Sequence, residues 1–301
     1  MTGRDFRIGA SAIVTAFALT ALLPSAAQAQ RDFSKVEITT ISLGDGIFML
    51  QGAGGNIGLS VGEDGPFVID DQFAPLSDKI MAAIKVQSDQ PVAFVLNTHY
   101  HGDHTGGNEA FGKAGAHIVA HDNVRQRLLE RDKEADAVSP DALPVITFSD
   151  SLTFHWNEQE IYVWHPNPAH TDGDAIIFMN DTNVVHMGDV FFNGGYPYID
   201  VGAGGSLNGY IETHEKVLGM INSDTMIIPG HGPLAKKADL ERTVSMLKDV
   251  RQRIQSLIDA GLEEDAIVAD DPLSDLNGEW GGGFINGERM VRTVYRSLSS
   301  D

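Results

Sequence analysis

The chain has 301 residues, of which 42% are hydrophobic, and it carries 42 acidic residues against 21 basic ones, a formal net charge of −21. This hydrophobic content is ordinary for a globular protein, so the composition excludes a disordered or fibrous chain. The negative charge disfavours binding to nucleic acid or to an anionic membrane, and the absence of cysteine excludes disulfides and thiolate ligands.

The N-terminal segment has the pattern of a secretory signal peptide. Arg4 and Arg7 precede an apolar run at 8–23, and the small-residue site Ala-Gln-Ala follows at 27–29. The run is shorter than the roughly 20 apolar residues that a membrane span needs. We expect cleavage of residues 1–29, which removes two positive charges and one negative and moves the formal charge from −21 to −22. The mature protein is then expected in the periplasm or outside the cell, without stable membrane insertion.

The region after the leader predicts two hairpins, a helix and a buried strand. Apolar and polar residues alternate over 36–52 on either side of Asp45-Gly46, and residues 57–71 repeat this form around a turn at 63–65. Apolar residues at helical spacing predict a helix from Ser77 to Val86. The apolar run at 91–97 is typical of a buried strand.

Further strands and helices alternate along the rest of the chain. Strands are predicted at 117–120, 146–156, 160–166, 175–180, 183–192 and from residue 225 onward, and helices from Asn123 to about Ala135, at 207–221 and at 238–260. Two successive groups of strands and helices predict an α/β fold, a layered sandwich with helices outside. Because no low-complexity linker divides the chain, we expect one domain from residue 30 to 301. The pattern is weakest over the last forty residues.

The stretch THYHGDHTGGN, residues 98–108, contains three histidines and an aspartate. His99 and His101 are two residues apart after a strand, so their side chains leave the same face and can reach one metal. Asp103 and His104 follow where glycines let the backbone turn toward a neighbouring site. Nitrogen and oxygen donors without sulfur suit zinc and also iron or manganese. The alternative, a cluster of solvated loop histidines, explains this alternation and its glycines poorly.

Three more donors lie at the ends of predicted strands. His170 stands before the strand at 175–180, Asp189 comes at the end of the stretch NVVHM, residues 183–187, and His231 follows the strand that begins near residue 225. Taken singly, each has a simpler reading as a turn residue, a cap or a surface histidine. Together they supply the ligands that two metal sites still lack. Asp172 and Asp174 either orient His170 or cap a turn before the strand.

This series resembles that of the metallo-β-lactamase superfamily, with His99, His101, Asp103 and His104 as its HxHxDH pattern and His170, Asp189 and His231 in order after it. The resemblance covers nearly the whole mature region and implies an αββα four-layer sandwich with two Zn²⁺ (or Fe or Mn) per chain between the sheets. It implies that His99, His101 and His170 hold the first metal, that Asp103, His104 and His231 hold the second, and that Asp189 bridges both. Asp70 matches an aspartate with a supporting role.

A metal pair of this kind lowers the pKa of bound water toward neutrality and supplies hydroxide as the nucleophile, with Asp103 as the residue that relays a proton. The expected enzyme is therefore a metal-dependent hydrolase acting on a small-molecule carboxylic ester, lactone, thioester or cyclic amide. The alternative is a true β-lactamase, which export favours. A non-catalytic member of the fold is disfavoured by the intact ligand set, and a nuclease by the acidity.

Substrate preference is less clearly marked in the sequence. Cysteine-using zinc β-lactamases have a cysteine at the place of Asp189, commonly followed three positions later by a lysine that binds the drug's carboxylate. This chain has Phe192 there, and its ligand set is closer to those of glyoxalase II and the lactonases. Four aromatic residues after Asp189 are candidates for an apolar wall of the cleft, with core packing as the alternative for the two Phe: Phe191, Phe192, Tyr196 and Tyr198.

Overall fold

The computed structural model describes residues 32–131 and 139–300. The chain divides into two compact units, Met1–Asp32 and Phe33–Asp301. The expected signal peptide lies outside the described residues, as does the end of the helix that was predicted to reach Ala135. Both β-sheets and all helices of the described ranges belong to the second unit. No helix in these ranges has the length and apolar character needed to cross a membrane.

The first sheet has seven strands whose order along the sheet is their order along the chain. They are β1 (Thr39–Gly44), β2 (Ile47–Gln51), β3 (Ile57–Ser60), β4 (Phe67–Ile69), β5 (Phe94–Leu96), β6 (His117–His121) and β7 (Ile146–Phe148). The antiparallel pairs β1–β2 and β3–β4 confirm both predicted hairpins. Strands β4 to β7 are mutually parallel, so their carboxyl ends share one edge of the sheet.

The second sheet has six strands in the order β13 (Ala235–Lys236), β12 (Met226–His231), β11 (Val184–Phe192), β10 (Ile176–Met179), β9 (Gln159–Trp164) and β8 (Ser151–Trp156). The single predicted stretch 146–156 is therefore two strands, β7 and β8, in different sheets. The chain leaves the first sheet at Ser149-Asp150 and enters the second. The three polar residues at 149–151 interrupt the alternation at this break, but the apolar positions keep the same phase on both sides, so the stretch reads as one strand.

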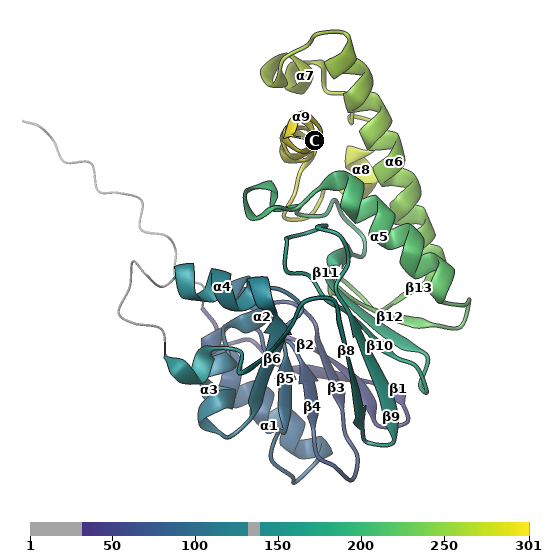
Figure 1. The fold of residues 1–301 in the computed structure, drawn as a ribbon. Helices are drawn as coiled ribbons and strands as arrows, with labels where there is room; N and C mark the ends of the chain where they lie inside the picture. Colours follow the sequence, from purple (N-terminus) through teal and green to yellow (C-terminus); the bar gives the residue numbers. More distant parts are fainter. Residues whose placement is uncertain (1–31, 132–138, 301) are drawn as a thin grey trace, which may run out of the picture. The chain divides into compact units, whose positions relative to one another are not determined.

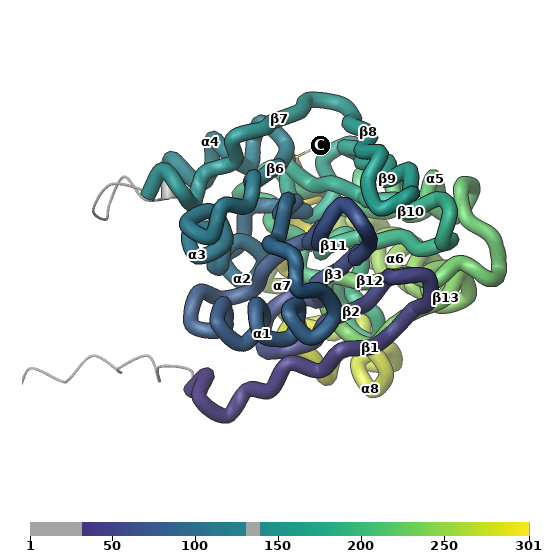
Figure 2. Tube along the Cα trace, turned by 90° about the horizontal axis from the view of Figure 1, so that it is seen from below, coloured from purple at the N-terminus to yellow at the C-terminus, as the bar shows by residue number. Residues whose placement is uncertain are grey.

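Helices cover the outer faces of both sheets (Figures 1 and 2). On the first sheet lie α1 (Ser77–Gln87), α3 (Asn108–Lys113) and α4 (Asp122–Arg131), and on the second lie α5 (Leu207–Met220) and α6 (Lys237–Asp259). One buried cluster joins inward residues of both sheets, among them Phe67 and Leu96 of the first and Ile177 and Ile228 of the second. The predicted αββα sandwich is therefore confirmed.

The last forty residues contain three helices that the sequence pattern did not predict: α7 (Glu264–Asp270), α8 (Asn277–Trp280) and α9 (Gly287–Ser300). Met290, Val291 and Val294 of α9 pack in the same buried cluster as α5 and α6. Short connecting elements complete the fold, namely α2 (Gly102–Thr105) and the 3₁₀ helices Ala74–Leu76, Pro140–Ala142 and Val201–Ala203. The C-terminal helices thus belong to the layer that covers the second sheet.

Candidate metal centre

All seven predicted ligands meet where the two sheets converge, although they come from five separate segments. His99 and His101 follow β5, Asp103 and His104 lie on α2, and His170 lies in the loop between β9 and β10. Asp189 lies within β11, and His231 is the last residue of β12. The donor atoms form two groups, each with its atoms within 4.8 Å of one another: His99, His101, His170 and Asp189 in the first, and Asp103, His104 and His231 in the second.

A glycine allows the two sheets to approach at this point. Gly188 precedes Asp189, has φ +50, and interrupts the regular pairing of β11 with β12. A Cβ on Gly188 would lie 2.6 Å from the side chain of Thr98, which directly precedes His99. Because only glycine combines this conformation with this contact, Gly188 brings Asp189 of the second sheet beside the histidines of the first.

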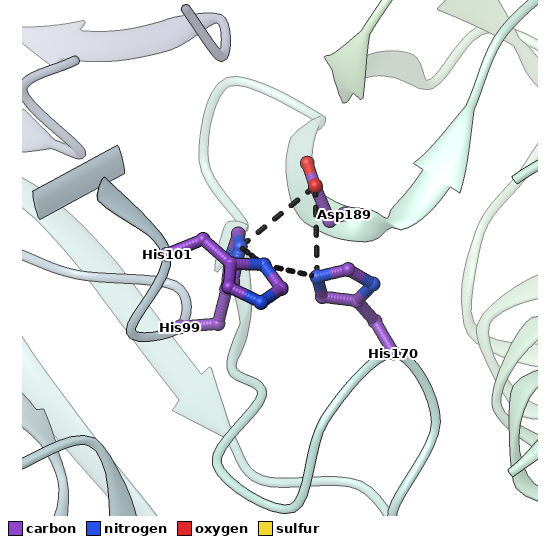
Figure 3. A group of neighbouring side chains, drawn as sticks. All are labelled: His99, His101, His170 and Asp189. Atoms are coloured by element: carbon purple, nitrogen blue, oxygen red, sulfur yellow. Dashed lines mark hydrogen bonds and ion pairs between the residues drawn. The ribbon is translucent and has the colours of Figure 1, made fainter. Parts of the chain in front are cut away.

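In the first group the histidine nitrogens face one another (Figure 3). Nδ1 of His101 lies 3.1 Å from Nε2 of His99 and 2.9 Å from Nε2 of His170. Oδ2 of Asp189 lies 3.8 Å from Nε2 of His99 and 3.6 Å from Nε2 of His170. Four donor atoms therefore surround one small volume.

In each of these three rings, one nitrogen points away from the group and forms a hydrogen bond there. That hydrogen bond determines whether the other nitrogen, which faces the group, carries a lone pair. Nδ1 of His170 donates to the carbonyl of Tyr198 at 2.8 Å, and Nε2 of His101 donates to Asp200 at 3.0 Å. The Thr98 hydroxyl donates to Asp70, so it accepts from Nδ1 of His99. Each neutral imidazole has one donor and one acceptor nitrogen.

It follows that three lone pairs point at one another in the first group. Burial lowers the pKa of His99, and it lowers the pKa of His170 to about 4, so both rings are neutral at ordinary pH. Lone pairs at these distances repel one another unless a cation lies between them. The donor set therefore fits a metal ion.

The charges of the second group, Asp103, His104 and His231, also fit a metal ion. Burial would lower the pKa of His231, but the Asp189 charge and the contact with Asp103 raise it to about 9. Burial likewise opposes a charge on His104, yet the carboxylates of Asp189 and Asp70 hold its pKa well above the usual value. Protons here neutralise clustered carboxylates, and a divalent cation can take their place.

Asp189 lies between the two groups. Its Oδ1 is 3.0 Å from Nε2 of His104 and 3.3 Å from Nε2 of His231, while its Oδ2 faces the first group. Oδ1 is buried and has no hydrogen-bond partner among the described residues, despite these short distances. A buried carboxylate oxygen without a hydrogen bond is costly, and a shared metal ion would satisfy it.

Two aspartates outside the donor set hold the ligands in place. Asp70 Oδ2 accepts from Nδ1 of His104 at 2.7 Å and from the Thr98 hydroxyl at 2.7 Å. Asp174 accepts from the backbone N–H of His170 at 2.7 Å. Asp172, the other aspartate of that loop, instead forms an ion pair with Arg127 at 2.6 Å. Of the two readings of this loop, the capped turn applies to Asp174, which also accepts from the Thr171 N–H and so holds His170 through its backbone.

Sequence reasoning missed Asp200. Its Oδ2 accepts from Nε2 of His101 and, at 2.9 Å, from the Tyr100 hydroxyl. Burial opposes its charge, but the contacts with His101 and Tyr100 lower the pKa of Asp200 to about 2, so it is a carboxylate at neutral pH. Asp200 lies in an irregular loop between Ile199 and a 3₁₀ helix, where no periodicity marks it; the only local signal is its role as N-cap of that helix.

The four aromatic residues after Asp189 divide between the core and the site. Phe191 and Tyr196 are buried in the cluster beneath the second sheet. The Phe192 ring stacks on His231 with centroids 5.0 Å apart, and the Tyr198 ring lies 5.7 Å from the ring of His170. Phe192 and Tyr198 therefore lie at the site and Phe191 in the core, whereas the expected place of Tyr196 in the cleft wall is wrong because its ring is buried in the core cluster.

Exposure shows from which side a substrate can reach the donors. The side chains of His231, Asp103 and His101 are 31%, 27% and 20% exposed. Those of His99, His104, His170 and Asp189 are at most 5% exposed. The three partly exposed donors therefore form the open face of the centre.

Comparison with known proteins agrees with this geometry. The family model described as the metallo-beta-lactamase superfamily matches residues 52–231. The "Probable metallo-hydrolase YqgX" of Bacillus subtilis (strain 168) is 28% identical over 52% of this chain and 75% of its own length. The hydroxyacylglutathione hydrolases of Polaromonas sp. and Nitrosococcus oceani are 29% and 26% identical over 51% and 60% of this chain. This chain spans 53% and 66% of their lengths.

Two solved structures share the fold. A metallo-beta-lactamase from Pontibacter korlensis superposes with a TM-score of 0.60 at 20% identity, covering 71% of this chain and all of that one. The DIM-1 metallo-beta-lactamase gives a TM-score of 0.61 at 17% identity, covering 71% of this chain and 99% of its own. With its His and Asp metal-binding groups and its family match, the chain belongs to the metallo-beta-lactamase superfamily and is a metal-dependent hydrolase.

Proposed function

We propose that this enzyme hydrolyses a carboxylic ester, lactone, thioester or cyclic amide at a centre of two zinc ions, with iron or manganese as substitutes. The observation that carries the proposal is the division of seven nitrogen and oxygen donors into two groups with Asp189 between them. His99, His101 and His170 would hold one ion, and Asp103, His104 and His231 the other. The similarity to hydroxyacylglutathione hydrolases supports a thioester among the substrates.

A bound pair of divalent ions would supply an activated water and polarise the substrate carbonyl. The protein itself positions the donors, because Asp70, Asp174 and Asp200 fix the orientations of His104, His170 and His101. Nearly complete burial of His99, His104, His170 and Asp189 keeps bulk water away from all but the open face.

Asp103 is the chain's own candidate for proton transfer. Its side chain is 27% exposed, and its Oδ2 lies 3.3 Å from Nε2 of His231. Burial opposes ionisation, but the contact with His231 and the nearby charge of His104 lower the pKa of Asp103 below its usual value. An ionised carboxylate on the open face can accept a proton at the oxygen that does not hold the ion and return it to the leaving group.

The test is a panel of purified-enzyme assays with metal analysis. We expect two ions per chain, hydrolysis of at least one thioester or ester, and loss of turnover after chelation that added zinc restores. Asp189→Ala should lower kcat by orders of magnitude and abolish the second ion while circular dichroism stays unchanged. Full activity in an exhaustively chelated preparation would refute the proposal. A panel that also holds a carbapenem and a cephalosporin decides whether the enzyme is instead a β-lactamase.

We also propose that the enzyme is exported and acts on small molecules in the periplasm or outside the cell. The basis is the charge and apolar pattern of residues 1–29 and the acidity of the chain that follows. Expression with the native N-terminus should give a mature protein that begins at Gln30 in the periplasmic or secreted fraction. An intact N-terminus and recovery from the cytoplasm would contradict this.

A further inference from the structure

An aromatic side chain lies directly beside the open face of the metal centre. The Tyr198 ring is 5.8 Å from the ring of His101 and 5.7 Å from that of His170, and its carbonyl accepts the hydrogen bond from His170 Nδ1. Tyr198 is half-buried. One side of its ring therefore packs against ligand histidines, and contacts on its other side bear on what can approach them.

The C-terminal region supplies that contact. The Phe284 ring packs edge-on against Tyr198 with centroids 6.1 Å apart. Phe284 is 69% exposed, and it is the only aromatic residue among the large hydrophobic side chains found exposed in the described ranges. A single exposed ring is common on protein surfaces, so the position of Phe284 beside Tyr198, rather than its exposure, is what bears on binding.

Flanking contacts hold the Phe284 segment in place. The carbonyl of Trp280 accepts a hydrogen bond from the Tyr196 N–H at 2.8 Å, which joins this segment to the loop after Asp189. Ile285 and Met290, on the other side of Phe284, are buried in the core cluster. The ring is thus exposed on a segment that is anchored before and after it.

Arg289 places a positive charge at the same spot. Its guanidinium lies over the Phe284 ring, 4.4 Å from the centroid, and Nη1 donates to the Phe284 carbonyl at 2.9 Å. The residue is exposed, and no ion pair joins it to a carboxylate within the described ranges. By contrast, Arg296 on the same helix α9 is bound by Glu264 at 2.9 Å.

Arg125 and Arg251 also form no ion pair within the described ranges, where they donate instead to the Pro144 carbonyl and to Asn208. What distinguishes Arg289 is its position on the Phe284 ring beside the metal centre. A guanidinium fixed on a phenyl ring keeps several donors free for a planar anion, and it binds carboxylates in bidentate geometry. The contacts lead from the ligand histidines through Tyr198 and Phe284 to Arg289. A substrate lying along them would meet the reaction centre at one end and a cation at the other.

We propose that Tyr198, Phe284 and Arg289 form the substrate-binding wall of the metal centre. The wall selects substrates that carry an apolar group against the two rings and a carboxylate, remote from the scissile bond, that pairs with Arg289. This inference rests on the proposed hydrolase function and names its substrate class: anionic thioesters or esters with a hydrophobic portion.

The test compares substrates that differ by one charge. The phenylacetyl thioester of 3-mercaptopropionate is paired with that of 3-mercaptopropionamide, and a second pair places the carboxylate or the amide on the acyl side. Because the chain has no cysteine, a thiol reagent reports the released thiol without background from the protein. In at least one pair, the wild-type enzyme should prefer the carboxylate by about tenfold or more in kcat/KM.

Variants locate that preference. Arg289→Ala should raise KM for the preferred carboxylate about tenfold, change KM for its amide less than twofold, and leave kcat nearly unchanged, while Arg289→Lys keeps part of the preference. Phe284→Ala should raise KM for both members of the pair. Arg296→Ala is the matched control, since Glu264 already binds its guanidinium, and it should behave as wild type. Circular dichroism and metal content verify that each variant is folded and loaded.

The outcomes separate the two proposals. If the wild type hydrolyses no member of either pair or of the wider panel, the hydrolase proposal fails. The wall is then judged by calorimetric binding of 4-phenylbutyrate against 4-phenylbutyramide, where only Arg289→Ala should abolish a preference for the acid. If the enzyme hydrolyses both members of each pair equally, or if Arg289→Ala keeps the wild-type preference, the wall is refuted while the hydrolase proposal stands.

Discussion

Replacement of Asp174 by alanine should destabilise the protein more than any surface change in the same loop. The Asp174 side chain is 2% exposed and accepts from the backbone N–H of His170 at 2.7 Å, from that of Thr171 at 2.9 Å, and from the Thr171 hydroxyl at 2.5 Å. Burial outweighs these donors and raises the pKa of Asp174 to about 7, so the carboxylate is charged only in alkaline buffer. The measurement therefore belongs near pH 8.

The alanine variant leaves three buried donors without a partner. Each costs about 1–3 kcal/mol, but at pH 8 the alanine variant no longer buries a charge whose raised pKa opposes folding, and water enters the emptied space. Asp174→Ala should therefore lower the free energy of unfolding by about 1 to 3 kcal/mol. Displacement of His170 should also weaken binding of the first metal ion by roughly 10- to 100-fold. Urea unfolding followed by circular dichroism gives the first quantity, and zinc titration against a chromophoric chelator gives the second.

Asp172→Ala is the matched control, two residues away in the same loop. Asp172 is 29% exposed and pairs with Arg127, and a partly exposed ion pair contributes at most about 1 kcal/mol. The reasoning is wrong if the two alanine variants unfold at the same urea concentration and bind zinc equally well. Such a result would mean that the hydrogen bonds of Asp174 do not hold the His170 loop.

Three further changes probe other parts of the fold. Asp200→Asn removes the charge that faces His101 and should weaken binding of one metal ion roughly 10-fold in a zinc titration. Burial lowers the pKa of His214 to about 4 in the folded protein. Below pH 6.5, His214 of the unfolded chain is therefore protonated while that of the folded protein stays neutral. The stability due to neutral His214 is present above pH 6.5 and falls by about 3 kcal/mol toward pH 4, a loss that His214→Gln should remove from urea unfolding curves. Gly230→Ala should abolish binding of both ions, because the new Cβ would lie 2.1 Å from Oδ1 of Asp189, the proposed bridging residue. Gly219→Ala, its control, lies in open space on α5 and should stabilise the protein by up to about 1 kcal/mol.

Each of these expectations has a clear contrary result. Tyr100→Phe removes the other hydrogen bond to Oδ2 of Asp200, and if it weakens zinc binding as much as Asp200→Asn does, the charge facing His101 is not the cause. Equal acid sensitivity of wild type and His214→Gln would exclude His214 from the pH dependence. Two bound ions per chain in Gly230→Ala would show that the strand can shift without moving the ligand.

The sequence predicted the layers well where hydrophobic periodicity sets them. The hairpin turn at Asp45-Gly46 and the helix α1 are found within a residue or two of the expected positions. The sequence did not predict elements whose ends or existence depend on tertiary contacts. The break between β7 and β8 sends two halves of one alternating stretch to different sheets, and helices α7 to α9 are stabilised by packing on α5 and α6 rather than by their own pattern.

The donor set was predictable because most of its members lie near strand ends in a regular order, although Asp189, expected at a strand end, lies within β11. The residues that orient the donors were only partly predictable. Asp174 is close to His170 in sequence, whereas Asp200 reaches His101 from 99 residues away, and nothing in the local sequence records that contact. Arg289 is further removed still, since it approaches the centre only through Phe284 and Tyr198.

The junction of the two sheets has a consequence for assembly of the active enzyme. Histidines that follow β5 and the bulged strand β11 reach the donor cluster from opposite halves of the sandwich, and each half alone offers an incomplete set. Binding of an ion and packing of the two sheets against each other are then linked equilibria. At a free zinc concentration 100 times the dissociation constant, one ion would raise the free energy of unfolding by about 2.7 kcal/mol. Zinc supply during biogenesis would thus control the yield of folded protein as well as its turnover.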